Sequence, residues 1–375
     1  MSILTTHTGS LPRPPELAER MLEYSNGQVK DLPGLWDEVA RATREVVRHQ
    51  VELGIDIVSD GEYGKASYAG YVKERLTGFE GEPRNLLRNL RDQTEFPDWV
   101  RSTPPRVTYP SNNAPVQLRD TSGVERDIAN MKAALVGIEP SGVFMSAASP
   151  GVVDTFMPST YYPTEEAYLR AVGAAMRAEY RAIVEAGFSL QVDCPDLAMS
   201  RHSRFANLSL EQFRATAQMH IDVLNAAIAG LPRERVRLHM CWGNYEGPHN
   251  HDIPLVDIVD IALQANVGAL SIEAANPRHA HEWKVFRDVA LPPGMKLIPG
   301  VIDSCTNYIE HPDLVAERLL RFAEVVGPDN VIAGTDCGFG TSVGPRHVAP
   351  SIAWAKLGSL VEGARIASAA LLATV

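Results

Sequence analysis

Short apolar runs rich in β-branched residues alternate along the chain with longer segments in which apolar residues recur at helical spacing. Eight such runs can be counted, at residues 3–8, 55–60, 143–148, 189–193, 236–241, 269–274, 296–301 and 330–335. Apolar strands separated by amphipathic helices are typical of βα units around a parallel sheet. Because eight strands close a (β/α)8 barrel, the pattern predicts a single-domain α/β protein with a TIM barrel over residues 1–375.

Several of the intervening helices have recognisable ends. A helical segment that opens near residues 33–34 should stop at Gly54, since glycine favours the turn that ends a helix. Thr164 precedes a helix that should run to Gly187. Ser209 and Gln212 have the spacing of a capping box, which predicts that a further helix begins there.

Residues 78–124 do not follow this alternation. They are rich in Pro, Arg, Asn and Asp and lack a long apolar period. We predict that they form an insertion, a loop or cap that follows the second strand of the barrel. Long connections of this kind are often lids or binding loops, and a contact between domains or subunits is an equally weighted alternative.

Composition excludes several classes of function. A chain of 375 residues that is 45% hydrophobic can bury a large core, and its net charge of −11 argues against a nucleic-acid partner. Without an apolar run of about 18 residues or a signal-peptide pattern, we expect no membrane association and a cytoplasmic protein. The cysteines are too few for a disulfide framework, so reduced thiols or metal ligands are expected at Cys194, Cys241, Cys305 and Cys337.

Polar side chains gather where the predicted strands end. The catalytic groups of TIM barrels lie at the carboxyl ends of the strands, so this is where chemistry is expected. A wrong set of strands would not be expected to place titratable or nucleophilic residues after nearly every one. The residues at these ends are His7, Ser10, Asp60, Glu62, Ser146, Ser149, Asp193, His239, Cys241, Glu273, Asp303 and Cys337.

His239 and Cys241 are the sharpest local signal. Residues two apart in a strand face the same side, so an imidazole and a thiolate can reach one metal. Glu273 ends the sixth predicted strand and Cys337 follows the eighth. One nitrogen, two sulfurs and a carboxylate predict a tetrahedral site, and the soft ligands favour zinc. The alternative is that all four are ordinary buried or rim residues.

Longer stretches resemble the cobalamin-independent methionine synthase family, in particular its C-terminal catalytic barrel and its short stand-alone members. The similarity covers nearly the whole chain. It rests on residues 5–14, which begin Thr-Thr-His-Thr-Gly-Ser, on Ser-Asp-Gly-Glu at 59–62, Gln-Val-Asp at 191–193, His-Met-Cys at 239–241, Ile-Glu at 272–273 and Asp-Cys-Gly at 336–338. The resemblance implies that the four candidate ligands hold zinc, which converts a small-molecule thiol into a thiolate that takes an alkyl group, and methyl is the group expected.

The resemblance also implies a substrate site for homocysteine at Ser10, Glu62 and Asp193. An ammonium group suits carboxylates such as Glu62 and Asp193, and a substrate carboxylate suits the backbone N–H groups and hydroxyl of residues 9–10. Salt bridges at the barrel rim are the alternative for the two acidic residues. Since a carboxylate holds zinc less firmly than a thiolate, Glu273 is the ligand expected to give way to the thiol.

The chain departs from the full-length members of this family at three places. It has no room for their second, N-terminal half, and it has no tryptophan after the third strand to stack on a pterin. After the seventh strand, Asp303 and Cys305 occupy the neighbourhood where those members have a catalytic histidine, so these two are candidates for a catalytic role. For Cys305 and Cys194, packing as small buried side chains is the favoured alternative.

These departures favour the stand-alone branch, whose methyl donor is a corrinoid protein or another donor. They also leave open the related epoxyalkane:coenzyme M transferases, in which the donor is an epoxide. The sulfonate of that acceptor would need a cation, and the candidates are Arg13, Lys65, Arg201 and Arg278. A zinc-stabilised binding barrel without catalysis is the alternative from another class. A homo-oligomer is left open.

Histidines follow two of the predicted strands without an assigned role. His249 and His251 lie in the loop after the metal-binding strand, and His279 and His281 lie after the sixth strand. They could contact substrate or form a second metal site. Because short histidine clusters are weak signals, we expect solvated loop histidines.

Overall fold

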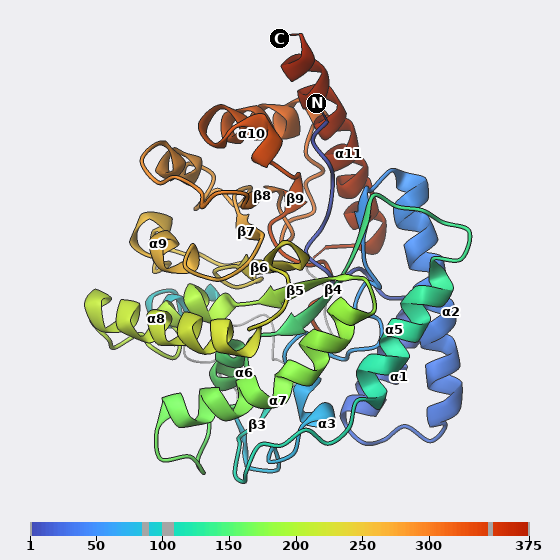
Figure 1. The fold of residues 1–375 in the computed structure, drawn as a ribbon, viewed down its shortest axis with the longest axis vertical. Coiled ribbons are helices and arrows are strands. Elements are labelled where there is room, and N and C mark those ends of the chain that lie inside the picture. The colour runs from blue at the N-terminus through green and yellow to red at the C-terminus, as the bar shows by residue number, and fades with distance from the viewer. Residues whose placement is uncertain (1, 85–89, 100–108, 344–347, 374–375) are drawn as a thin grey trace.

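A parallel sheet of seven strands forms the centre of the computed structural model, which describes residues 2–84, 90–99, 109–343 and 348–373. The strand order is β1-β4-β5-β6-β7-β8-β9 (Figure 1). Its strands are β1 (Ile57–Val58), β4 (Gly142–Ala148), β5 (Ser189–Asp193), β6 (Val236–Met240), β7 (Ala269–Glu273), β8 (Lys296–Ile302) and β9 (Gly334–Thr335). A small antiparallel pair is formed by β2 (Pro83–Arg84) and β3 (Tyr109–Pro110).

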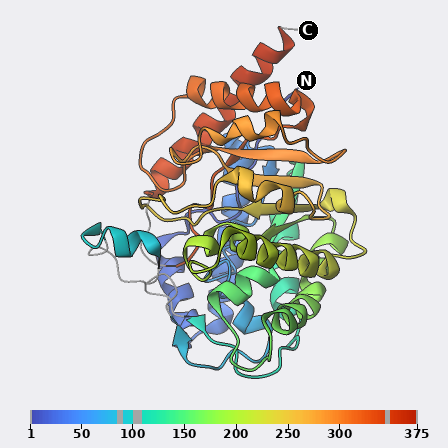
Figure 2. The same cartoon turned by 90° about the vertical axis from the view of Figure 1, so that its left-hand side faces the viewer.

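Helices cover the outer face of this sheet (Figures 1 and 2). Covered on one face and curved around a packed interior on the other, the strands are buried along nearly their whole length, as in β6, where every residue is buried. The helices are α1 (Pro15–Ser25), α2 (Leu32–Leu53), α3 (Val72–Arg75), α4 (Arg91–Glu95), α5 (Ser122–Ala134), α6 (Pro150–Phe156), α7 (Glu165–Glu185), α8 (Leu210–Ala227), α9 (Val259–Ala262), α10 (Pro312–Val326) and α11 (Pro350–Leu372).

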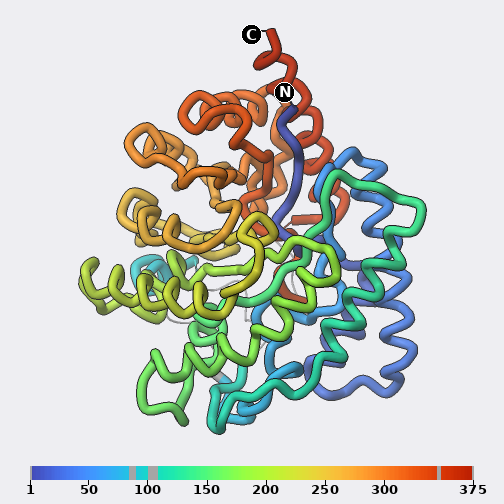
Figure 3. Tube along the Cα trace, viewed as in Figure 1, coloured from blue at the N-terminus to red at the C-terminus, as the bar shows by residue number. Residues whose placement is uncertain are grey.

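The N-terminal segment runs between the first and the last strand of the sheet. The Ile57 N–H donates to the Thr5 carbonyl at 2.9 Å, and the Thr6 N–H donates to the Ala333 carbonyl at 2.8 Å. Asp56 accepts from both the backbone N–H and the hydroxyl of Thr5, each at 2.8 Å. Figure 3 shows this dark blue stretch descending from the N-terminus into the molecule, at the end where the C-terminus also lies.

The structure confirms a mixed α/β fold with a parallel sheet that curves into a half-barrel. Residues 3–8, expected as a regular strand, form only the isolated bridge between Thr5 and Ala333, and the strand expected over 330–335 shortens to β9. In residues 3–8, threonine hydroxyl groups replace some of the backbone hydrogen bonds of a regular strand. Thr6 Oγ1 donates to the Ile57 carbonyl at 3.1 Å, and Thr8 Oγ1 donates to the Thr335 carbonyl at 2.9 Å.

The helix ends expected from the sequence are confirmed. Helix α2 stops before Gly54, which has a left-handed φ of 95°. The Thr164 side chain caps the first turn of α7. At the start of α8, Ser209 and Gln212 make both hydrogen bonds of a capping box. In the part of the chain that the structure describes, none of the helices combines the length and apolar character needed to cross a membrane.

Part of the predicted insertion at 78–124 contains β2, β3 and α4, and α5 begins within it. Residues 85–89 and 100–108 lie outside the described residues, and the insertion itself stays a prediction. Helix α4, cyan between the grey traces in Figure 2, contacts the loop that follows β6. Its buried Asp92 accepts from the Tyr245 hydroxyl at 2.8 Å and from the His249 N–H at 2.9 Å. Helix α4 therefore packs against the loop at the carboxyl end of β6.

A buried ion network joins α6, α7 and α8. His220 Nδ1 lies 2.8 Å from Asp196 Oδ2, and its Nε2 lies 3.2 Å from Glu165 Oε1. Asp154 pairs with Arg204 at 2.9 Å. Burial lowers the pKa of His220, but its hydrogen bonds to the two carboxylates outweigh this and raise the pKa to about 9. One ligand atom each from Asp154, Glu165 and His220 lies within 4.8 Å of the others. In this structure the ion pairs of His220 with Asp196 and Glu165, and of Arg204 with Asp154, link the helices.

We predict that His220→Gln destabilises the protein in a pH-dependent way. A folded-state pKa raised from 6.5 to about 9 contributes stability that is fully present below pH 6.5 and is lost as the pH rises through 9. The shift corresponds to about 3 kcal/mol. Denaturant unfolding of both proteins from pH 6 to pH 10 should show the gap narrowing toward alkaline pH. A gap that is constant or widens would contradict the charged network.

Candidate active site and metal centre

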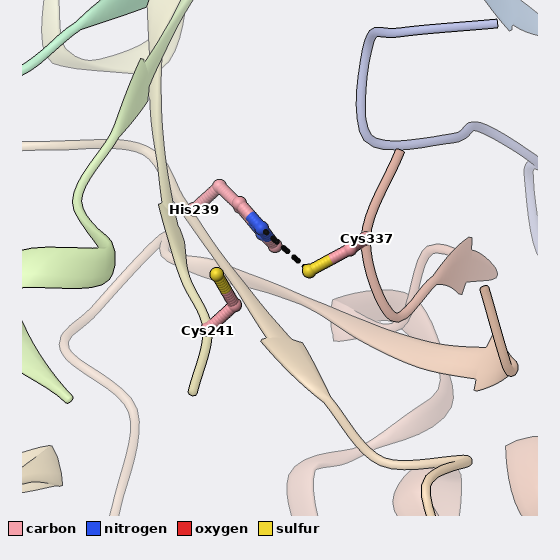
Figure 4. A group of neighbouring side chains, drawn as sticks. All are labelled: His239, Cys241 and Cys337. Carbon is pink, nitrogen blue, oxygen red and sulfur yellow. Dashed lines mark hydrogen bonds between the residues drawn. The ribbon is translucent and has the colours of Figure 1, made fainter. Parts of the chain in front are cut away.

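Three predicted metal ligands meet at one edge of the sheet. His239 lies on β6, Cys241 directly after it, and Cys337 in the loop after β9. Their ligand atoms all lie within 4.8 Å of one another, and all three side chains are buried. Figure 4 shows them pointing toward a common space, with a contact of 3.6 Å between His239 Nε2 and Cys337 Sγ. Parallel strands bring their carboxyl ends to the same edge, which unites residues 98 positions apart.

Glu273, the fourth predicted ligand, lies at the border of this group. Its Oε1 is 3.5 Å from Cys337 Sγ and accepts a hydrogen bond from the Trp242 N–H at 2.9 Å. It does not belong to the set whose ligand atoms are mutually within 4.8 Å. Burial raises the pKa of Glu273, while the nearby His279 and His249 oppose this. The carboxylate is thus close enough to join the group by a side-chain rotation.

The environment of His239 keeps its imidazole neutral, the form that binds metals. Burial, followed by the charge of Arg237, lowers the pKa of His239 to about 3. The pKa of Cys337 is raised well above its usual value, first by the hydrogen bond with Cys241 and then by burial. A bound cation is the kind of group that reverses such an effect and stabilises thiolates.

Arg237 is a buried cation beneath the metal ligands that sequence reasoning missed. Its guanidinium donates to Gln191 Oε1 at 2.8 Å and to the His7 carbonyl at 2.8 Å, and it lies 3.4 Å from the centre of the Phe144 ring. Burial lowers its pKa to about 9, against the charge of Asp193. An arginine two positions before His239, and so on the same face of a buried strand, was the signal in the sequence that could have found it.

Two predicted substrate residues form a buried carboxylate pair. Glu62 Oε1 accepts from Ser146 Oγ at 2.6 Å, whereas its buried Oε2 has no hydrogen-bond partner among the described residues. Asp193 Oδ1 accepts from Gln191 Nε2 at 2.7 Å. Burial, then the charge of Glu62, raises the pKa of Asp193 well above its usual value, and nearby cations compensate only in part. Such a pair suits a ligand that carries a positive charge.

The backbone around these residues is shaped for close approach. Glu62 has a φ of 60°, an uncommon conformation for a residue with a side chain and one that clusters at functional sites. A Cβ at Gly9, whose φ is 106°, would lie 2.4 Å from Glu62 Oε1. Ser10, the third predicted substrate residue, is buried, and its Oγ accepts from the Gly340 N–H at 3.3 Å. The backbone of Gly9 therefore lies directly against the Glu62 carboxylate.

Asp303 and Cys305, the candidate catalytic residues, lie in the turn after β8. The Asp303 carboxylate accepts from the N–H groups of Cys305 and Thr306, each at 2.9 Å, so it shapes its own turn. Cys305 Sγ lies 3.1 Å from Asn244 Oδ1 in the loop after β6. Burial raises the pKa of Cys305 well above its usual value, which disfavours a thiolate nucleophile. Their catalytic role stays a prediction. Cys194 is buried in the core.

The expectation of solvated histidines is wrong for His249 and His279. Both are buried, and each places a ring nitrogen 2.8 Å from Asp252 Oδ2. His279 also stacks on Trp242 at 3.9 Å between ring centres. A buried carboxylate needs such donors, which no short sequence pattern reveals. His251 is partly exposed beside Glu95, and His281 is exposed, as expected.

Tyr68 is a further residue that sequence reasoning missed. Burial raises its pKa well above the usual value, and the charges of Cys241, Asp193 and Cys337 add to this effect. The hydroxyl therefore stays protonated close to both the thiols and the carboxylate pair. Tyr68 lies in a loop without a recognisable motif, and only folding brings it here.

The sequence matches a known protein family over most of its length. The model of the cobalamin-independent synthase catalytic domain matches residues 3–101 and 155–362. A methionine synthase of Sulfolobus acidocaldarius is 26% identical over 369 residues, which cover 96% of this chain and 91% of that protein. A methionine synthase of Saccharolobus solfataricus is 23% identical, with 96% and 94% covered.

Two solved structures share the fold. A B12-independent methionine synthase from Shewanella sp. W3-18-1, in complex with selenomethionine, has a TM-score of 0.77 at 22% identity and full coverage of both chains. A putative vitamin-B12 independent methionine synthase from Listeria monocytogenes has a TM-score of 0.64 at 16% identity, with 98% and 99% covered. Since the family model matches well over half of its residues, the chain belongs to the cobalamin-independent synthase catalytic-domain family.

Proposed function

We propose that this protein is an enzyme that transfers a methyl group onto the thiol of homocysteine, with zinc held by His239, Cys241, Cys337 and Glu273. The observation that carries the proposal is the buried group of one imidazole and two thiols at the same sheet edge as the Glu62 and Asp193 pair. The curated relatives that match almost the whole chain are methionine synthases, which supports methyl as the transferred group.

The donor set fits zinc. A neutral imidazole and two thiols in a buried space are soft and borderline ligands, which favour zinc over magnesium or calcium. Glu273 at the border of the group supplies a weaker fourth ligand. When bound there, zinc would lower the pKa of an incoming thiol so that it reacts as the thiolate at neutral pH.

The chain's own residues would orient the amino acid. Glu62 Oε2, which lacks a partner among the described residues, and Asp193 would receive the ammonium group. Ser10 Oγ accepts from Gly340, so its own O–H is a donor for the substrate carboxylate. The thiol would then point toward Cys241 and Cys337. These contacts hold the sulfur in one direction, which lowers the entropic barrier to the transfer.

Glu273 would be the ligand that yields to the thiol. Its Oε1 already accepts a hydrogen bond from the Trp242 N–H. This donor would stabilise the carboxylate when it does not bind the metal. The Tyr68 hydroxyl, whose pKa is raised well above its usual value, stays protonated near the same thiols. The proposed chemistry therefore has a replaceable ligand in Glu273.

Homocysteine fits better than coenzyme M. The cations proposed for a sulfonate donate to backbone carbonyl groups: Arg13 to Gly340 and Glu62, Lys65 to Ser146, Arg201 to Phe205, and Arg278 to Asn250. The buried carboxylates of Glu62 and Asp193 would repel a sulfonate and attract an ammonium group.

We also infer that residues 3–8 act as the eighth strand and close the sheet into a (β/α)8 barrel. The hydrogen bonds of this segment to Ile57 on one side and Ala333 on the other support this closure. A closed barrel has no exposed sheet edge, and its interior positions are filled by side chains.

Zinc-edge X-ray absorption tests the function directly. The sulfur neighbours of the metal should at first be those of Cys241 and Cys337 alone. Homocysteine should add one sulfur and coenzyme M none. A sulfur added by coenzyme M only would favour the alternative acceptor, and no change with either thiol would favour a binding protein without catalysis.

Replacing a thiol should remove the metal without unfolding the chain. We expect Cys241→Ser and Cys337→Ser each to bind zinc at least about tenfold more weakly, since a thiolate ligand is lost while the large core remains. Cys194→Ser, at a buried thiol outside the group, is the matched control and should keep its zinc. Zinc affinity, measured in competition with a chromophoric chelator, and thermal unfolding are the measurements. Wild-type zinc affinity in both ligand variants would refute the site.

The carboxylate pair makes a separate prediction about substrate affinity. Glu62→Gln keeps an acceptor for Ser146 but removes one charge, so the Kd for homocysteine should rise at least about tenfold. Titration calorimetry on the zinc-loaded protein measures this, with zinc content as the control. An unchanged Kd would point to an acceptor thiol without an amino group.

A further inference from the structure

Asp336 makes a three-way contact that the proposed chemistry does not use. Its Oδ1 accepts from the N–H groups of Ala274 and Ala275, each at 2.8 Å, and its Oδ2 accepts from the N–H of Asn276 at 2.7 Å. The side chain is 2% exposed. One carboxyl group thus satisfies three consecutive backbone donors that lie about 60 positions away in the sequence.

The contact joins the loop that follows Glu273 to the loop that carries Cys337. Residues 274–276 follow Glu273 directly, and Asp336 directly precedes Cys337. The Asp336 N–H also donates to the Ile302 carbonyl at 2.9 Å, which anchors the loop to β8. Any movement between the end of β7 and the end of β9 would stretch these bonds.

Gly300 leaves the space that the Asp336 side chain occupies. Strand β8 lies between β7 and β9, and its Gly300 pairs with Glu273 on one side and Gly334 on the other. A Cβ at Gly300 would lie 2.4 Å from Asp336 Oδ1 and 2.5 Å from its Cα. Because Gly300 has no side chain, the Asp336 side chain can cross β8 and reach the turn after β7.

We propose that Asp336 is a positioning residue of the metal centre that fixes the backbone of Glu273 relative to Cys337. This role rests on the proposed function, because it concerns the same ligands. We call the three hydrogen bonds from residues 274–276 to Asp336 the clamp. The clamp holds the backbone after Glu273 and does not involve the Glu273 carboxylate. With zinc bound, the Glu273 carboxylate would therefore be free to rotate while its Cα stays in place.

The geometry sets what can replace the carboxyl group. Two oxygen acceptors face three N–H donors, so an amide of the same shape must turn its NH2 group toward at least one of them. Asp336→Asn therefore loses at least one hydrogen bond and places the NH2 group of the amide against a backbone N–H group. The volume of the side chain is almost unchanged. Gly300→Ala keeps the carboxyl group but displaces it, and should give the same result by a different route.

The experiment compares Asp336→Asn and Gly300→Ala with wild type, and uses Asp127→Asn as the matched control. Asp127 is a buried carboxylate of α5 that pairs with Arg75. We expect the first two variants to bind zinc about 10- to 100-fold more weakly in competition with a chromophoric chelator. The visible bands of the cobalt-loaded protein should also change, since the ligand geometry is altered. We expect the control to unfold more easily but to keep the wild-type zinc affinity and cobalt bands.

Amide hydrogen exchange provides a readout that requires no variant. In the metal-free wild type, the N–H groups of residues 274–276 should exchange slowly, and Asp336→Asn should accelerate them at least about tenfold. Rapid exchange in the wild type would overturn the clamp, even if a variant failed to fold. Wild-type zinc affinity and cobalt bands in folded Asp336→Asn would also overturn it. Zinc that binds without Cys241 and Cys337 would instead overturn the proposed function, while the exchange result would still decide the clamp.

Discussion

The parallel alignment of the strands is the constraint on which the site depends. In a parallel sheet, all strands end at the same edge, and the side chains just beyond them must share one space. His239, Glu273 and Cys337 come from three different strand ends, yet each lies within contact distance of another. An antiparallel sheet with the same residues would send half of them to the opposite edge. The chemistry therefore follows from strand direction before any side chain is considered.

Burial changes the pKa values of the acidic groups at this end of the sheet, and it also opposes folding because charged groups lose their hydration. Carboxylates and thiols lose hydration when they are covered, so their pKa values rise unless a charge or hydrogen bond compensates. Asp193 and Cys337 show this effect, while Asp252 is compensated by the histidines around it. The first two belong to the proposed ligand sites, where a bound cation or ammonium would supply what the chain lacks. Asp252 belongs to the scaffold.

Glycines decide how closely the parts of the site approach. Gly9 admits the Glu62 carboxylate, and Gly300 admits the side chain of Asp336. At both positions a Cβ would come within 2.5 Å of the neighbouring oxygen, well inside van der Waals contact. The precision of the site thus depends on absent side chains as much as on present ones, and a single methyl group at either glycine would displace a functional carboxyl group.

The sequence by itself determined the positions of strands β4 to β8, the helix caps and the grouping of His239, Cys241 and Cys337. These rest on local rules: period-two and helical patterning, a capping box at Ser209, and the i, i+2 spacing of His239 and Cys241. Only the tertiary structure decided that His249 is buried, that Tyr68 lies near the thiols, and that Asp336 spans β8 to the turn after β7. Each of these depends on contacts between segments far apart in the chain, and no local pattern encodes which distant backbone or carboxylate a side chain will meet.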